Sequence, residues 1–215
     1  MKKQTQISIE SYHSDGFIGA YQKLIKDTVI PYQYSVLCDE APGVEKSHVL
    51  QNFINAGAAV HGGDVGDGFY GMVFQDSDAG KWIEAVAYSL SVIPDPELEA
   101  TADRFIDAIA SAQDTDGYLN THFTINHKDR RWTNLLEGHE LYTAGHLMEG
   151  ACSYYEATGK RKFLDVMHRN VEHIYNHFIV EGHEGYPGHL YQTVSTLSND
   201  IHPLRFLLAP SASCA

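Results

Sequence analysis

Residues 87–109, AYSLSVIPDPELEATADRFIDAI, are echoed about 65 positions later by residues 152–174, CSYYEATGKRKFLDVMHRNVEHI. In both stretches apolar residues recur with a helical period on either side of a short break. Each is followed by a loop containing an acid, a glycine and a tyrosine: Asp116-Gly117-Tyr118 and Glu184-Gly185-Tyr186. A helical hairpin that repeats with the same loop predicts an all-α solenoid or a toroid of hairpins.

Helical periodicity extends along most of the chain. We expect six helices, in about three hairpins, over residues 15–37, 46–59, 77–92, 96–113, 135–158 and 162–179. Residues at their ends have the expected types: Asp76, Ser77 and Asp78 as caps, Pro96 in a first turn and Gly159 as a C-terminal cap.

Two stretches between these helices are expected not to be helical. DTDGYLNTHF, residues 114–123, predicts a turn and a short extended piece. In its Gly117-Tyr118 pair we expect the glycine to turn the chain and the tyrosine to plug the hairpin end, with sugar stacking by the tyrosine as the alternative. HGGDVGDGFYGM, residues 61–72, is too rich in glycine for a helix and predicts a loop close to other backbone or to a ligand.

The overall charge narrows the class of partner. With 15 basic and 28 acidic residues the net charge is −13, which disfavours binding to nucleic acid or to an anionic membrane. No apolar run resembles an export signal or a membrane span, so we expect a cytoplasmic location. Cys38, Cys152 and Cys214 are far apart in sequence and predict neither a disulfide framework nor a thiolate zinc site.

The stretch GHELYTAGH, residues 138–146, places His139, Glu140 and His146 close together in sequence. On a continuous helix the two histidines would share a face about 10 Å apart, at about 1.5 Å of rise per residue. Zinc proteases instead place their histidines one turn apart, in the order H-E-x-x-H. A metal site is therefore not predicted, and the histidines are interpreted as ligand contacts or as core residues.

Other polar residues are weighed in the same way. Thirteen histidines is a high number, and four lie at expected junctions between loops and helices: His122, His139, His183 and His189. This placement favours ligand contact for His139 and His189. Gln75, Asp76 and Asp78 follow the glycine-rich loop; capping accounts for the acids, and secondary contact with a substrate is the sharper alternative. Trp82, one turn further on, is expected in the core.

Several long motifs, in order, resemble the N-terminal part of glycoside hydrolase family 127, the β-L-arabinofuranosidase family. They are VIPYQYSVLCDE, FYGMVFQDSDAGKWIEAVAYSL, PDPELEATADRFIDAIASAQDTDGYLNT, GHELYTAGHLMEGACSYYEATGKRKFLDVM and GYPGH. The resemblance covers about residues 29–189. It implies a partial (α/α)6 toroid here, followed in the whole enzyme by β-sandwich domains.

The resemblance also implies a chemistry. Family members are exo-acting retaining enzymes that release β-L-arabinofuranose, so an arabinose-containing oligosaccharide is the expected partner. Their nucleophile is a cysteine activated by a zinc ion, which cysteines and a glutamate hold, and a further glutamate is the acid/base. His139 and His189 match family histidines that contact the sugar.

The catalytic centre of the family lies in later toroid helices. Cys38, Cys152 and Cys214 match none of its cysteines, so no zinc and no catalytic residue are expected in these 215 residues. Residues 1–189 are therefore expected to form the N-terminal part of the catalytic domain. Residues 190–215, LYQTVSTLSNDIHPLRFLLAPSASCA, show no family character and are expected to arise from truncation or a frameshift.

Three functions remain open at this point. The first is an inactive part of an arabinofuranosidase that keeps a sugar-contacting wall. The second is a helical-repeat carbohydrate-binding or scaffold module without catalysis. The third is a glycosidase that works through carboxylates, with Asp76, Asp78 or Asp116 as candidates. Half a toroid leaves apolar helix faces uncovered, so we expect low stability or self-association through the open edge.

Overall fold

The computed structural model describes residues 14–181 and is all-α over that range, with no strand among those residues. The helical elements are, in chain order: α1 (Phe17–Leu24), a π-helical segment (Ile25–Val29), α2 (Ile30–Leu37), α3 (Val49–Val60), α4 (Ser77–Val92), α5 (Pro96–Ser111), α6 (Thr121–Asn126), a 3₁₀ turn (Lys128–Arg130), α7 (Leu135–Gly138), α8 (Glu140–Thr158), α9 (Lys162–Tyr175) and a second π-helical segment (Asn176–Val180). The partial toroid of helices is confirmed.

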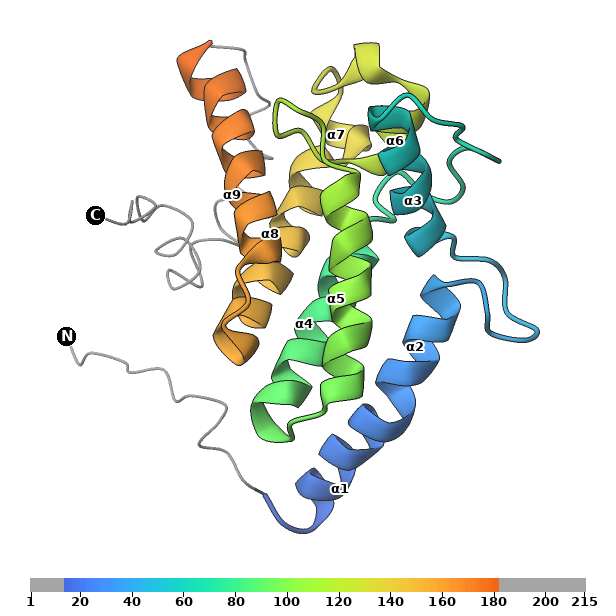
Figure 1. Ribbon diagram of the computed structural model, residues 1–215, viewed down its shortest axis with the longest axis vertical. Helices are drawn as coiled ribbons and strands as arrows, with labels where there is room; N and C mark the ends of the chain where they lie inside the picture. The colour runs from blue at the N-terminus through green and yellow to red at the C-terminus, as the bar shows by residue number, and fades with distance from the viewer. Residues whose placement is uncertain (1–13, 182–215) are drawn as a thin grey trace, which may run out of the picture.

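The two echoed stretches form the two hairpins α4–α5 and α8–α9 (Figure 1). α4 packs along α8, and α5 contacts α9. The two hairpins therefore stack with the first helix of one against the first helix of the other, and the second against the second. α2 packs against α4, and α3 packs against α5 and α6. One continuous core results, with the largest apolar side chains fully buried, among them Phe53, Ile83, Phe105, Leu147 and Met167.

Local signals set several helix ends, as expected for Pro96 and Gly159. The Asp95 carboxylate accepts hydrogen bonds from the backbone N–H groups of Glu97 and Leu98, at 3.2 and 3.1 Å, and Pro96 begins α5. Gly159 ends α8 in the left-handed region, at φ 72°. Trp82 is 3% exposed, and its indole N–H donates to the carbonyl of Ile30 at 3.0 Å, which confirms its place in the core.

Two expectations about local structure were wrong. The helix expected over residues 135–158 is broken at His139, which has φ 50° and separates α7 from α8. The extended piece expected within residues 114–123 is instead the start of α6, capped by Asn120, whose side-chain oxygen accepts the N–H of Phe123 at 3.1 Å. Asparagine caps favour a helix at this point, and the sequence pattern around it was too short to show one.

The Gly117-Tyr118 pair serves the packing of the hairpins, as expected. Gly117 has φ 91°, and a β-carbon there would lie 2.5 Å from the carbonyl oxygen of Arg169 on α9. The Gly117 carbonyl accepts from the side chain of Asn170 at 3.1 Å. Tyr118 is fully buried. The glycine therefore lets the loop lie directly on α9, and the tyrosine fills the space beneath it.

No helix within residues 14–181 combines the length and the apolar character that crossing a membrane would require.

Candidate functional site

The ends of the hairpins at which α4 and α8 begin are joined by a set of loops and short helices. The glycine-rich loop reaches α6 through Phe69, whose ring lies 4.8 Å from that of His122. Phe74, two residues beyond that loop, reaches the head of α8, where its ring lies 5.3 Å from that of His139. We call this region the mouth: residues 61–76, α6, α7 and His139.

Side chains of α3 hold the glycine-rich loop in place. Asn52 makes a pair of hydrogen bonds with the backbone of Tyr70: its oxygen accepts the N–H at 3.0 Å and its amide donates to the carbonyl at 2.8 Å. Asn55 donates to the carbonyl of Gly68 at 2.7 Å. Both asparagines are buried. These bonds hold the loop in a defined conformation against α3. The loop therefore lies close to another part of the chain, as expected.

His48 adds a second attachment of the same loop. Its Nδ1 lies 2.6 Å from a carboxylate oxygen of Asp39, and its Nε2 lies 3.3 Å from one of Asp67, which belongs to the glycine-rich loop. Burial pushes the pKa of Asp39 upward, but the bonds from the His48 backbone and ring outweigh it and lower the pKa. Sequence analysis did not single out His48, because its two carboxylates are distant in sequence.

Asp76 is not the cap of α4. Its side chain makes no capping bond and is instead almost fully buried, 1% exposed. One carboxylate oxygen accepts the backbone N–H of Thr121 at 2.7 Å, and the other accepts its hydroxyl at 2.6 Å. Burial raises the pKa of Asp76 to about 6, against the opposing effect of these two bonds. The residue fastens the start of α4 to the start of α6.

Gln75 and Asp78 differ from Asp76 and from each other. The Gln75 amide lies 3.2 and 3.3 Å from two oxygens of Ser47, and its oxygen accepts the N–H of Met72 at 3.0 Å. Asp78 is partly exposed and lies 3.3 Å from the Lys81 amine. Secondary contact of Gln75, Asp76 and Asp78 with a substrate stays a prediction, and of the three only Asp76 is buried.

His139 stands at the head of α8 with its ring among aromatic side chains. It is half-buried, and its ring lies edge-on to Phe74 at 5.3 Å and 5.9 Å from Tyr142. Within residues 14–181 its imidazole nitrogens have no hydrogen-bond partner. Aromatic neighbours around unengaged polar atoms are typical of a site that binds a small polar ligand. His189, its expected partner in sugar contact, lies outside the described residues, as does His183.

His146 has a different environment. Its Nδ1 lies 3.0 Å from a carboxylate oxygen of Glu149, and its ring lies 4.6 Å from that of Tyr142. It therefore contacts two other side chains of α8. Because His139 precedes α8 and is not part of it, the expected sharing of one helix face by the two histidines does not apply. Among the described residues no three His, Cys, Asp or Glu side chains are arranged to hold a metal ion.

His122 is also brought into the mouth. Its ring contacts those of Phe69 and Phe123, and its Nδ1 is buried without a hydrogen-bond partner. Burial, together with the nearby His127, lowers the pKa of His122. His122 and His139, which the sequence placed at separate junctions, thus both contact aromatic residues of the segment 61–76: Phe69 and Phe74 respectively.

Glu140 lies below His139 and is 1% exposed. Its carboxylate accepts the hydroxyl of Tyr118, and the backbone N–H of Trp132 lies 3.0 and 2.9 Å from its two oxygens. Burial raises the pKa of Glu140 to about 7, and the bonds from Tyr118 and Trp132 oppose that rise. The sequence showed no sign of this buried carboxylate, because a single acid at a helix start is normally exposed.

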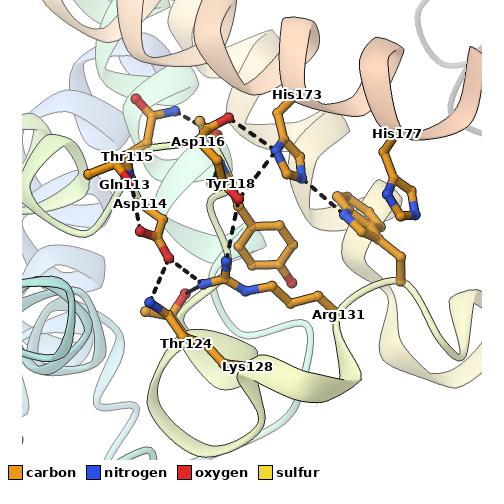
Figure 2. A network of polar contacts seen from close by, with 12 residues as sticks. Gln113, Asp114, Thr115, Asp116, Tyr118, Thr124, Lys128, Arg131, His173 and His177 are labelled. Carbon is orange, nitrogen blue, oxygen red and sulfur yellow. Dashed lines mark hydrogen bonds and ion pairs between the residues drawn. The ribbon is translucent and has the colours of Figure 1, made fainter. Parts of the chain in front are cut away.

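A network of charged side chains surrounds Tyr118 (Figure 2). The Arg131 guanidinium lies 3.9 Å from the centre of the Tyr118 ring. The same guanidinium lies 2.9 Å from a carboxylate oxygen of Asp114. Burial raises the pKa of Asp114, but its bonds to Lys128, Thr115 and Arg131 prevail and lower it to about 2. The network ties the loop after α5 to the segment that leads into α7.

His173 continues this network onto α9 (Figure 2). Its Nε2 accepts the indole N–H of Trp132 at 3.1 Å, since an indole nitrogen only donates. Its Nδ1 lies 3.1 Å from the carbonyl oxygen of Asp116 and donates to it. His173 therefore joins the loop after α5 and the segment before α7 to the outer helix of the second hairpin.

Neither described cysteine lies in surroundings that favour its thiolate form. Burial raises the pKa of Cys152 to about 12, and burial likewise raises the pKa of Cys38. A zinc-binding or nucleophilic thiolate needs surroundings that lower the thiol pKa. Cys214 lies outside the described residues.

Comparisons with known proteins all indicate the same enzyme family. The family described as "Beta-L-arabinofuranosidase, GH127 catalytic domain" matches residues 13–194, which extends beyond both ends of the expected stretch. A non-reducing end β-L-arabinofuranosidase of Bifidobacterium longum subsp. longum is 41% identical over 158 residues, which are 66% of this chain and 23% of that protein.

Two solved structures have the same fold. A GH127 β-L-arabinofuranosidase from Geobacillus stearothermophilus T6 superposes with a TM-score of 0.75 and 40% identity, over 91% of this chain and 30% of that one. A second GH127 β-arabinofuranosidase superposes with a TM-score of 0.72 and 27% identity, over 93% of this chain and 33% of that one. The chain therefore spans about a third or less of the length of these relatives.

Proposed function

Because the chain belongs to glycoside hydrolase family 127, we propose that it forms the N-terminal part of the catalytic toroid of a retaining exo-β-L-arabinofuranosidase. In this proposal it supplies one wall of the sugar-binding mouth. The ligand is the non-reducing end of an arabinose-containing oligosaccharide, and His139 and His189 contact it.

The observation that carries this proposal is the setting of His139. The imidazole contacts the rings of Phe74 and Tyr142, with its nitrogens unengaged by the described residues. Aromatic rings pack against the apolar face of a sugar, and an imidazole exchanges hydrogen bonds with its hydroxyl groups. The fastening of the glycine-rich loop keeps Phe74 in place without any ligand present, which lowers the entropic cost of binding.

We further propose that these 215 residues do not hydrolyse the substrate by themselves. The relatives that carry the activity in their names are three to four times longer than the stretch they share with this chain. The zinc–cysteine centre expected from the family resemblance is proposed to lie in that remaining length. The raised thiol pKa values of Cys38 and Cys152 support this placement.

The carboxylates considered as an alternative catalytic set lie in unlike environments. Asp76 is buried on Thr121, Asp78 pairs with Lys81, and Asp116 lies beside Arg131 and His173. Glycosidases that use two carboxylates need both of them to face one bond of the substrate. Burial of Asp76 removes it from that role, which supports binding without hydrolysis.

Binding is tested with methyl β-L-arabinofuranoside as the probe and the full 215-residue chain. We expect saturable binding by calorimetry or ligand-observed NMR, weakened at least about tenfold in His139→Ala, which corresponds to about 1.4 kcal/mol. His146→Ala, the matched change of a histidine within α8, should bind like the unaltered chain. Equal binding by both variants would leave a scaffold role as the better description.

Catalysis is tested separately with an aryl β-L-arabinofuranoside, with and without added zinc. We expect no turnover by this chain in either case. Turnover that persists without zinc and disappears in Asp78→Asn or Asp116→Asn would replace this proposal with the carboxylate mechanism.

We also propose self-association through the open edge of the partial toroid. α1 buries none of its residues, and apolar side chains along it are exposed, with Phe17 at 76% and Tyr21 at 52%. Uncovered apolar surface of this kind favours association. Sedimentation over a hundredfold range of concentration should show a rising mean mass, and Phe17→Glu should suppress it. A constant monomer mass would remove the proposal.

A further inference from the structure

We propose that Glu140 is a positioning residue, which holds His139 in its left-handed backbone conformation at the head of α8 through bonds to Tyr118 and to the backbone of Trp132. The inference rests on the proposed function, because it concerns how the sugar-contacting His139 is presented. It adds a residue that itself has no access to the ligand.

The backbone around Glu140 is strained at two points. Trp132 has φ 63° and His139 has φ 50°, and they are two of the four non-glycine residues with positive φ within residues 14–181. The left-handed region costs free energy for any residue with a β-carbon, so it persists only where surrounding bonds impose it. These two residues enclose α7, and both lie next to or in contact with Glu140.

The Glu140 carboxylate closes the segment between those two points. Its oxygens lie 3.0 and 2.9 Å from the N–H of Trp132, eight residues earlier in the chain. Glu140 directly follows His139. The bond therefore links Trp132, one strained residue, to the residue next to His139, the other strained residue. A β-carbon on Gly138 would lie 3.1 Å from the Phe123 ring and 3.5 Å from a Glu140 carboxylate oxygen, which shows how closely the turn packs.

Tyr118 fixes the other side of the carboxylate. The tyrosine is fully buried, donates its hydroxyl to Glu140, and lies beneath the Arg131 guanidinium. Arg131 is held in turn by Asp114, at 2.9 Å (Figure 2). The charged network thus ends at Glu140, the first residue of α8, and it restricts the position of the Glu140 carboxylate.

Burial separates Glu140 from any direct role with a ligand. At 1% exposure, with both oxygens engaged by groups from outside α8, it has neither access nor a free acceptor. His139, the next residue, is half-buried with its nitrogens unengaged by the described residues. Glu140 is therefore held inside the protein by its bonds, whereas His139 faces the mouth.

Glu140→Gln is the informative variant, because it keeps shape and one acceptor oxygen. Its amide group would face the N–H of Trp132, so a donor would meet a donor where the carboxylate now accepts. Tyr118→Phe removes the other bond without changing the ring. Glu137→Gln, an exposed acid of α7 three residues away, is the matched control.

The first readout is the imidazole NMR signal of His139 without ligand, assigned by its loss in His139→Ala. Its position depends on the edge-on ring of Phe74, so it reports where the imidazole stands. We expect it to shift or broaden in Glu140→Gln and Tyr118→Phe, and to stay unchanged in Glu137→Gln. An unchanged signal in the first two variants, both folded, would overturn the inference. If Glu140→Gln does not fold, Tyr118→Phe decides.

The second readout is the dissociation constant for methyl β-L-arabinofuranoside. We expect about a tenfold increase in Glu140→Gln and no further increase when His139→Ala is combined with it, since both changes remove the same contact. If His139→Ala binds the probe like the unaltered chain, the proposed function fails, and the NMR readout alone still judges the inference. If His139→Ala weakens binding and Glu140→Gln does not, only the inference fails.

Discussion

Gly80 of α4 and Gly150 of α8 bring the backbones of the two helices into direct contact. A β-carbon on Gly150 would lie 2.6 Å from the carbonyl oxygen of Gly80, and one on Gly80 would lie 2.4 Å from the carbonyl oxygen of His146. Such distances leave no room for a side chain, so the two hairpins are joined at a crossing that only glycine permits.

We therefore expect Gly150→Ala to lower the free energy of unfolding by about 1–3 kcal/mol, the usual cost of overpacking. The obstructing atoms belong to backbone and cannot turn aside. Gly63→Ala is the control, because its β-carbon would meet Ala58 at an ordinary 3.5 Å. Denaturant unfolding of both variants measures the difference, and equal stabilities would show that the helices separate at little cost.

Stability should fall as the pH rises from about 4 to 7. The pKa values of Glu140 and Asp76 are raised by burial from 4.5 and 3.8 to about 7 and about 6. A carboxyl with a higher pKa in the folded state stabilises the protein fully below its unfolded pKa, and this contribution is lost as the pH passes the folded pKa. Each group contributes on the order of 3 kcal/mol by this relation.

Glu140→Gln should flatten that pH dependence, since the amide does not titrate. Denaturant unfolding between pH 4.5 and 7.5 is the measurement, and Glu137→Gln, on the exposed side of α7, should keep the original slope. A slope in Glu140→Gln identical to that of the unaltered chain would contradict the assigned origin.

Asn52→Ala should loosen the glycine-rich loop. The change removes both bonds to the Tyr70 backbone and leaves its N–H and carbonyl without these partners, at a cost of about 1–3 kcal/mol. Amide hydrogen exchange across residues 61–75 should accelerate, while exchange in α8 stays slow. Asn126→Ala, at an exposed position of α6, is the control and should leave the loop protected.

Cys152 should resist alkylation in the folded protein. Its pKa of about 12 leaves about a thousandfold less thiolate than an ordinary cysteine has near pH 8, and burial blocks access besides. Peptide mapping after iodoacetamide treatment measures labelling at each cysteine. Rapid labelling of Cys152 before unfolding would mean that α8 opens far more readily than its packing indicates.

The repeat of residues 87–109 in residues 152–174 was sufficient to predict the hairpins and their stacking. Apolar spacing depends on helix geometry alone, so it is visible in the chain order, and the caps Asp95 and Gly159 are local in the same sense. The family resemblance could likewise be recognised from motifs in sequence, and it was confirmed by the match over residues 13–194.

Tertiary contacts alone decided the architecture of the mouth. His139 interrupts a stretch whose periodicity is helical throughout, and the next residue, Glu140, bonds Trp132 and Tyr118 from other segments. Asp76 had the position of a cap but bonds Thr121, 45 residues away. Local sequence determines which helices form, since each depends on neighbours within a few residues. Which buried acid is bonded, and which histidine is left unengaged, depends on groups that only folding brings together.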